Sequence, residues 1–440
     1  MKELTAGAAV VDITPKQSLQ LRGYPHVDRL ATGTHDPLLS TALCLDNGET
    51  VVMLIANDNV FMSKTLAQAA RERINAATGI PGSHILLSAT HTHSGSASTT
   101  RLYTFETNAM PDSAFMAQYE EGIVEAGIKA FENRRPAEAG LAVADATGVG
   151  TNRRDPAGPT DPQAPVLAVR DIETGAMLCV MTVYGMHPTV LHEDSTLYSA
   201  DFPGMCRQYL QQHVVGADCP VGYHTGPAGN QSPRHVTKAN TFEEAERLGQ
   251  MLGKAIEKAL SRIDYRRDID LAAVQTEVEL LPRTYPPVDE AEQKLKQARQ
   301  RLDNLLATGT RQDARTAECD WFGAEHTSTL ARIAREDNGA RLRQAIAERS
   351  PAEVQAIRVG HWTFVGWPGE IFVEFSLALK KAFDDTFVIA YANGETHSYL
   401  VTQEAVDEGG YECMTAIFQS PESGNRLLDT ARNLLKSMGA

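Results

Sequence analysis

The sequence predicts an α/β protein in which mixed β-sheets are flanked by helices. Apolar runs of strand length alternate with amphipathic segments of helix length in both halves of the chain. One run, Glu49–Ala56, precedes the helical segment Ser63–Ala77 and another follows it, which is the pattern of a βαβ unit with parallel strands. Between residues 288 and 349 the composition shifts to Ala, Arg, Gln, Glu and Leu. We interpret residues 1–440 as a single domain with a helical hairpin inserted at 288–349.

The expected strands are apolar runs bounded by turn residues. Glu173–Gly175 separates two of them closely enough to form a hairpin. In chain order the strands are Ala8–Ile13, Glu49–Ala56, His84–Ser88, Val166–Arg170, Met177–Val183, a strand around Val221 and Phe387–Ala390, and the apolar stretch Val354–Val365 continues the core after the inserted segment.

The expected helices carry apolar residues at helical spacing and have end signals. Ser63 is placed to cap the first helix and Gly79 to end it, while Thr241 and Glu244 have the spacing of a capping box. The inserted segment is interpreted as a solvated helical excursion, with a lid or an oligomer contact as alternatives. The other helices are Ser63–Ala77, one from Asp112 or Ser113 to Phe131, one after Asp201–Gly204, one from Thr241, and one through Phe372, Phe375, Leu379 and Phe383.

The composition excludes several classes of partner. A formal net charge of −15 disfavours binding to nucleic acid and to anionic membranes. No apolar run approaches the roughly 20 residues that span a bilayer, so stable membrane association is not expected. The six cysteines are scattered, and the N-terminus lacks the apolar core of a signal peptide, which predicts reduced thiols and a cytoplasmic location. We expect a small-molecule substrate, and a homo-oligomer remains open.

The first candidate site is Thr90–Gly95, which reads T-H-T-H-S-G and directly follows an expected strand. If the strand continues, His91 and His93 point to the same face, because side chains alternate along a strand. One imidazole could then bind a metal ion while the other donates a hydrogen bond to a substrate oxygen. Two ordinary structural histidines explain the pair equally well when it is taken alone.

His187 and Glu370 also follow apolar strands. Pro188 keeps His187 extended, which suits a metal ligand, although a lone histidine is more often structural. Glu370 follows a Pro-Gly corner and precedes a helix, so it is either a ligand or a first-turn acid that favours the helix dipole. Two histidines and a glutamate with an open fourth position form a common catalytic zinc shell.

Three further residues lie in stretches that suit a catalytic loop. Tyr399 follows a broken strand and could ligate a metal or donate its hydroxyl to an oxyanion. Ser232 is presented by the glycine-rich loop Gly226–Arg234, and Arg153 is placed to meet a carbonyl or carboxylate. Each has a structural alternative. Tyr399 could be an ordinary half-buried aromatic residue, the Ser232 loop a surface turn, and the Arg153 stretch an exposed basic turn.

Taken together and in this order, these stretches resemble the catalytic domain of the neutral/alkaline non-lysosomal ceramidase family. The motifs that carry the resemblance are Thr90–Gly95, His187–Thr189, Ser199–Gly204, Gly229–Pro233, Pro368–Glu370 and Tyr399–Thr402. The resemblance implies a neutral-ceramidase-like fold and Zn²⁺ as cofactor, held by the side chains of His91, His187, Glu370 and Tyr399. It also implies that His93 stabilises the oxyanion, with Tyr399, Arg153 and Ser232 as further catalytic residues.

The implied activity is zinc-dependent hydrolysis of an amide bond in an N-acyl amine, by attack of metal-bound hydroxide. The family's C-terminal β-sandwich and export signal are not found, and Ser94–Ser98 replaces a Gly-Pro-Gly-Gly stretch, so we expect a small, polar substrate. One alternative is a zinc-dependent esterase or lactonase acting on a soluble carbohydrate or acid derivative. A second is a metal-dependent lyase or isomerase of a sugar acid.

Two other classes fit the sequence less well. A serine hydrolase using Ser232 or Ser94 is disfavoured because the chain has no G-x-S-x-G motif. A non-catalytic protein with a structural zinc is disfavoured because such sites are usually rich in cysteine, and no cysteine lies in the proposed ligand motifs.

Overall fold

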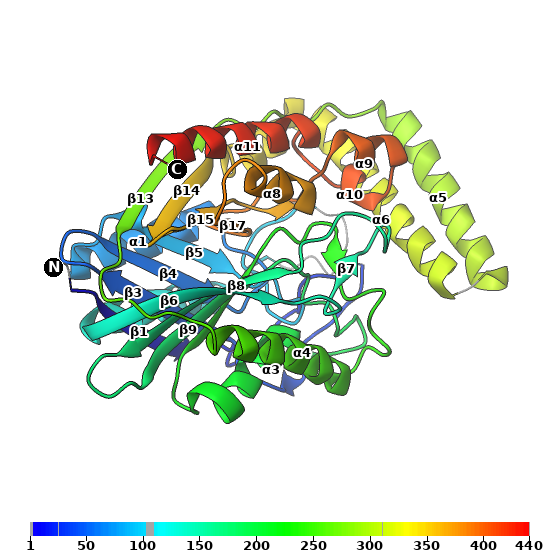
Figure 1. The fold of residues 1–440 in the computed structure, drawn as a ribbon. Coiled ribbons are helices and arrows are strands. Elements are labelled where there is room, and N and C mark those ends of the chain that lie inside the picture. Colours follow the sequence, from blue (N-terminus) through cyan, green and yellow to red (C-terminus); the bar gives the residue numbers. More distant parts are fainter. Residues whose placement is uncertain (1–2, 25, 103–109, 310, 440) are drawn as a thin grey trace.

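The computed structural model describes residues 3–24, 26–102, 110–309 and 311–439, and its largest element is an eight-stranded mixed sheet (Figure 1). The strand order is β11-β9-β8-β6-β1-β3-β4-β5. The β4 and β5 strands are parallel, as the expected βαβ unit requires, and β8 and β9 form the expected antiparallel hairpin. The strands are β1 (Thr5–Asp12), β3 (Leu39–Asp46), β4 (Val51–Asn57), β5 (Ile85–Ala89), β6 (Arg135–Asp145), β8 (Gln163–Asp171), β9 (Met177–Tyr184) and β11 (Val221–Thr225).

A four-stranded sheet packs against one face of the large sheet. Its order is β13-β14-β15-β17, with β13 (Leu271–Val278), β14 (Ala352–Val359), β15 (Trp362–Gly366) and β17 (Thr386–Ile389). Alternate residues of β3, β4 and β5, such as Leu43, Leu54 and Leu86, share one apolar cluster with Ile357 and Phe364 of this second sheet. The two sheets therefore form a sandwich with a common core.

Helices cover both outer faces of the sandwich. On the large sheet, α1 (Lys64–Thr78) and α2 (Ser113–Glu132) pack over β1, β3 and β4, while α3 (Asp201–Leu210) and α4 (Phe242–Leu260) pack over β8, β9 and β11. On the second sheet, α8 (Val373–Lys380) and α11 (Ser420–Ser437) cover the outer face. The result is four layers, helix–sheet–sheet–helix, which confirms the predicted mixed α/β class (Figure 1).

Local end signals account for most of the helix boundaries. The Ser63 hydroxyl accepts the Leu66 N–H at the start of α1, and Gly79 ends that helix at φ 76°, where a side chain would be strained. The α3 helix begins at Asp201 itself, so the prediction that it follows Asp201–Gly204 is wrong. Its proline falls in the first turn, where no intrahelical N–H bond is lost.

The α4 capping box forms only in part. Thr241 caps the helix by accepting the Glu244 N–H, as expected. The Glu244 carboxylate, however, accepts the Lys238 N–H and the Arg247 guanidinium instead of returning to Thr241. The loop before α4 thus takes the acceptor that a complete capping box would have used.

Residues 288–308 and 311–347 are helical, as the composition of the segment predicts. The segment comprises α5 (Val288–Thr308), α6 (Arg311–Arg335) and α7 (Ala340–Ala347), and we refer to it as the helical segment. The α5 and α6 helices form a hairpin at one end of the molecule (Figure 1). The α5 helix is largely exposed, whereas Leu330 and Ile333 of α6 join the apolar cluster beneath α8 and α11.

Three two-stranded pieces join distant loops. They pair β2 (Gly33–Thr34) with β10 (Leu197–Tyr198), β7 (Thr151–Asn152) with β12 (Gln231–Ser232), and β16 (Glu370–Ile371) with β18 (Tyr399–Leu400). The short helices α9 (Gln403–Glu408) and α10 (Tyr411–Met414) follow β18. Among the described residues, no helix combines the length and the apolar character needed to cross a membrane.

Candidate metal centre

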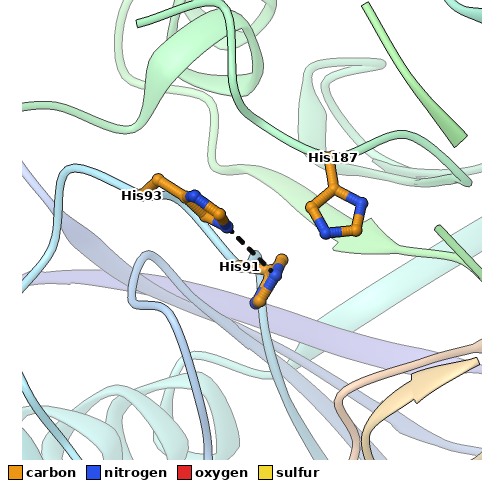
Figure 2. Close-up of side chains that lie close together, drawn as sticks. All are labelled: His91, His93 and His187. Atoms are coloured by element: carbon orange, nitrogen blue, oxygen red, sulfur yellow. Dashed lines mark hydrogen bonds between the residues drawn. The ribbon is translucent and has the colours of Figure 1, made fainter. Parts of the chain in front are cut away.

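The two histidines of Thr90–Gly95 meet in a turn, not on a strand. The β5 strand ends at Ala89, and His91 has a left-handed φ of 64°, which is uncommon for a residue with a side chain. The prediction that strand alternation aligns the two rings is therefore wrong. The turn nevertheless brings His93 Nε2 to 3.2 Å from His91 Nε2 (Figure 2). Strained backbone of this kind is common where a side chain must be aimed at a site.

Hydrogen bonds to the backbone orient two of the three imidazoles. His91 Nδ1 lies 2.8 Å from the Val60 carbonyl oxygen, and His187 Nδ1 is bound by the Ala228 carbonyl. Because each Nδ1 carries the donated hydrogen, each Nε2 keeps its lone pair and faces the centre of the cluster. Tyr391 stacks on the His91 ring at 4.1 Å and fixes its plane.

Glu370 completes the convergence from the second half of the chain. Its Oε2 lies 3.3 Å from His187 Nε2 and 3.4 Å from His91 Nε2. Burial alone would raise the pKa of this carboxyl, but His91 and His187 reverse that effect and hold the pKa well below its usual value. Glu370 is therefore an anion at neutral pH.

His93 and His187 are neutral at the same pH. Burial, with Arg153 nearby, lowers the pKa of His187 to about 4, and burial together with His91 and His187 lowers the pKa of His93 well below its ordinary value. A neutral imidazole has the free lone pair that metal binding requires.

The spacing of these atoms fits a tetrahedral metal ion. Ligand atoms of His91, His93 and His187 all lie within 4.8 Å of one another, and Figure 2 shows the three rings turned toward a common space. Ligands about 2.0–2.1 Å from a tetrahedral zinc stand about 3.3 Å apart. The separations from Glu370 Oε2 to His187 Nε2 and to His91 Nε2, 3.3 and 3.4 Å, agree with that value. The donor set, neutral nitrogens with one carboxylate oxygen, fits zinc.

Tyr399 and Arg153 border the cluster. The β16–β18 pairing places Tyr399 opposite Glu370, and the rings of Tyr399 and His187 are 6.4 Å apart. The Tyr399 hydroxyl lies 3.3 Å from the Tyr411 hydroxyl, and burial raises its pKa, with Glu370 acting in the same direction. Tyr399 is thus a protonated phenol in the described structure. Its role as a metal ligand remains a prediction.

Arg153 is half-buried beside His187. Its Nη1 lies 3.5 Å from His187 Nε2, and its Nε lies 3.2 Å from Glu412 Oε1. The guanidinium carbon is 5.2 Å from the centre of the Tyr399 ring. The alternative of an exposed basic turn does not hold, because the β7–β12 pairing draws this loop inward.

Ser232 is also near the site but is engaged locally. It lies in β12, opposite Thr151 of β7, and its Oγ accepts the Arg234 N–H at 3.2 Å. The side chain is buried and lines the same cavity as the histidines. A catalytic role for Ser232 remains a prediction.

The sequence reasoning missed Tyr411 and Glu412. Glu412 is 3% exposed and binds both Arg153 and Arg154, at 3.2 and 3.0 Å. Tyr411 lies between Tyr399 and the helical segment. The glycine pair that precedes them, followed at once by an aromatic and an acidic residue, was the available signal of a specialised turn.

Most of these side chains line a cavity of about 570 Å³. Tyr24 and Phe61 form walls beside the histidines, with ring centres 5.0 Å from His93 and from His91. The α6 helix also lines the cavity, so the helical segment is not simply solvated. The α6 residues that line the cavity are Arg315, Thr316, Glu318, Cys319, Asp320 and Phe322.

Comparison with known families shows which family the chain belongs to. A family model for neutral/alkaline non-lysosomal ceramidase, N-terminal, matches residues 4–234, just over half of the 440 residues. The chain belongs to this ceramidase family. The match contains His91, His93, Arg153, His187 and Ser232, and so confirms the resemblance seen in the motifs.

Solved ceramidases share the fold of this family member. A neutral ceramidase from Pseudomonas aeruginosa has a TM-score of 0.75 at 16% identity, over 99% of this chain and 75% of that one. A ceramidase complexed with C2 gives the same TM-score and identity, over 99% of this chain and 76% of that one. At this identity the likeness concerns the fold, and it extends beyond residue 234. No curated protein matches the chain.

Proposed function

We propose that this ceramidase-family protein is a zinc-dependent hydrolase that cleaves the amide bond of a small, polar N-acyl amine. The observation that carries the proposal is the convergence of His91, His187 and Glu370 beside a large cavity, with the carboxylate oxygen 3.4 and 3.3 Å from the two Nε2 atoms. Membership of a family described as ceramidases supports amide hydrolysis. The proposal treats residues 1–440 as one catalytic domain, with residues 288–349 inserted in it.

His91, His187, Glu370 and Tyr399 are the proposed ligands. The carboxylate contributes one negative charge, so the site retains net positive charge with a divalent ion. When bound, zinc supplies Lewis acidity and lowers the pKa of water to about 7. Glu370 supplies the one carboxylate oxygen of this ligand set.

His93 and Arg153 are the proposed catalytic donors. His93 is neutral, and an N–H on its Nε2 can donate to an oxygen that gains negative charge in the transition state. Arg153 is charged, lies next to His187 and lines the cavity, so it can orient the carbonyl of the substrate. Hydrolysis breaks the amide C–N bond, with the water hydroxyl passing to the acyl carbon and a proton to the amine nitrogen.

The compartment and assembly state are also proposals. All six cysteines are free in the structure, in keeping with a reducing cytoplasm. A small-molecule substrate fits the enclosed cavity. A homo-oligomer is still only a prediction.

The test combines metal analysis with product analysis. The purified protein should contain about one zinc per chain and should hydrolyse a soluble N-acyl amine until a chelator removes the metal. In heavy-oxygen water the released acid should gain one solvent oxygen. Amide cleavage that survives complete removal of metal would exclude the zinc mechanism. Ester or lactone cleavage without amide cleavage would favour the esterase or lactonase alternative.

A further inference from the structure

The wall of the cavity where α6 meets the loop after β12 has a distinctive charge arrangement. Arg234 follows β12 and reaches α6, where its Nη2 donates to Thr316 Oγ1 at 3.0 Å. The Ser232 hydroxyl accepts the Arg234 backbone N–H and so holds the start of this loop. Arg234, Thr316 and Cys319 all line the cavity.

Most carboxylates that line the cavity are bound to arginines. Arg153 binds Glu412, Arg154 binds Glu408, Arg315 binds Glu318 and Arg301 binds Asp320. Glu370 lies among the histidines. Asp155 is exposed and accepts a backbone N–H of its own turn, and among the described residues it is the one other carboxylate of the lining without a cationic partner. Most of the negative charge is therefore already used, and a further cation in the lining can remain unpaired.

Arg234 is such a cation. Within the described part of the chain its guanidinium forms no ion pair, and its one side-chain hydrogen bond goes to a neutral hydroxyl. A guanidinium presents several N–H groups in a planar fork, and this fork matches a carboxylate in two parallel hydrogen bonds. With Nη2 only partly used by Thr316, the remaining N–H groups can receive a ligand.

Arg234 is exposed, and it lines the same cavity as the proposed catalytic residues. Arg153 and Arg315 line this cavity too, together with Cys319 of α6. Burial raises the pKa of the Cys319 thiol and so does Glu412, while Arg315, Arg234 and Arg153 act in the opposite direction. An anionic group in this part of the cavity would meet several positive charges.

We propose that the substrate carries a carboxylate that binds Arg234, so that the substrate class is anionic N-acyl amines. This inference rests on the proposed amide hydrolysis. Tyr24 and Phe61, beside the histidines, accept the hydrocarbon part of the substrate, and the carboxylate extends toward α6. The helical segment thereby selects charged substrates over uncharged lipids.

Paired substrates test the inference. The probes are hexanoylglycine, its homologues with one and two more methylenes before the carboxylate, and the primary carboxamide of each. We expect at least one acid to exceed its carboxamide about tenfold in kcat/KM, mainly through a lower KM. Arg234→Gln should bring that ratio close to one. Arg341→Gln is the matched control, because Arg341 is an exposed arginine on α7.

A binding measurement provides a readout that does not need turnover. Cys319 is partly exposed in the cavity, and Cys413 is a partly exposed thiol that does not line it. The best acid should slow iodoacetamide labelling of Cys319 at least fivefold, with metal present or removed, and leave Cys413 unaffected. Arg234→Gln should abolish this protection, and Arg341→Gln should keep it.

The outcomes separate the two proposals. Protection of Cys319 that depends on Arg234, without hydrolysis of any amide, would support the anion site and reject the proposed function. Chelator-sensitive amide hydrolysis with equal use of acids and carboxamides would reject the anion site and leave the function standing. Neither protection nor hydrolysis would reject both.

Discussion

At the scale of single residues, the site depends on keeping several imidazoles neutral and closely packed. His91 and His93 place their Nε2 atoms 3.2 Å apart, and two charged rings at that distance would repel strongly. Burial avoids this repulsion by favouring the uncharged form of His93. A neutral ring can act as a hydrogen-bond donor beside a ligand, so the two adjacent histidines can have different roles.

Substitution of the two kinds of histidine should give different phenotypes. His187→Ala removes a proposed ligand and should lose zinc as well as activity. His93→Ala should keep zinc and lose about two to four orders of magnitude in kcat, or roughly 3–5 kcal/mol of barrier, because an oxyanion donor is gone. Metal analysis alongside steady-state kinetics checks both. Loss of zinc in the His93 variant would instead make His93 a ligand, as its place in the three-histidine cluster allows.

A histidine outside the metal cluster should make the fold sensitive to acid. His224 on β11 is fully buried against the Ser88 hydroxyl, and burial lowers its pKa from 6.5 to about 3. Between these two values the unfolded chain binds a proton that the folded chain does not. Stability should therefore fall with decreasing pH from about 6.5 to 3, by about 1.4 kcal/mol per pH unit for this residue.

Denaturant unfolding at pH 7.0 and 5.0 measures that dependence. His224→Gln should reduce the loss of stability between the two pH values by about 2 kcal/mol relative to the wild type. Other buried histidines keep part of the dependence in both proteins. An identical pH dependence in the variant would show that His224 does not contribute.

At the scale of elements, the proposed site residues lie in segments that follow the strands, and not in the strands of the two large sheets. The β5 and β9 strands of the large sheet lead to the histidine loops, while β15 and β17 of the second sheet lead to Glu370 and Tyr399. A loop containing Gly23 then packs directly on the His93 ring. Gly23 has a φ of 106°, and a Cβ at this position would lie 2.2 Å from His93 Cγ.

Gly23→Ala should therefore damage activity with little effect on the fold. The added methyl group must displace the His93 ring, so we expect kcat to fall at least tenfold with zinc retained. Gly48→Ala is the matched control, because Gly48 also has a positive φ, 82°, but a methyl group added there would meet no described atom within 4 Å. Equal kinetics of the two variants, measured with thermal unfolding to confirm folding, would remove the packing argument.

Elements with local signals were predictable from the sequence. The α1 helix, the parallel β4–β5 pair and the β8–β9 hairpin were found because capping residues, apolar periodicity and turn residues lie within a few positions of them. The turn at His91 was not found, because a left-handed residue just beyond a strand leaves no periodic signature. The prediction that His91 and His93 lie side by side was therefore correct, but the structure achieves this by a turn and not by strand alternation.

Contacts between distant elements were beyond sequence reasoning. Nothing near Arg153 in sequence indicates that Glu412, 259 positions away, binds it. The stacking of two sheets likewise depends on which faces of β3, β4, β14 and β15 meet, and each face alone looks like an ordinary apolar surface. Motif order supplies the long-range information that periodicity lacks, since it relates His91, His187 and Glu370 to one another across most of the chain.

At the scale of the whole molecule, the proposed metal centre connects the two halves of the chain. His91 and His187 extend from the large sheet, whereas Glu370 and Tyr399 follow strands of the second sheet. The matched family region ends at residue 234, so it includes only part of the centre. A bound ion would therefore stabilise the packing of one sheet on the other as well as support catalysis.

This arrangement predicts that metal removal lowers thermal stability. An ion present at about a thousand times its Kd stabilises the folded state by about 4 kcal/mol. The unfolding entropy of a chain this long makes 1 kcal/mol worth about 1 °C, so a chelator should lower Tm by about 4 °C. Glu370→Gln should reduce both zinc affinity and the chelator effect, because it removes the ligand from the second sheet. A chelator effect of the same size in Glu370→Gln and wild type, at matched free zinc, would show that the ion does not connect the two sheets.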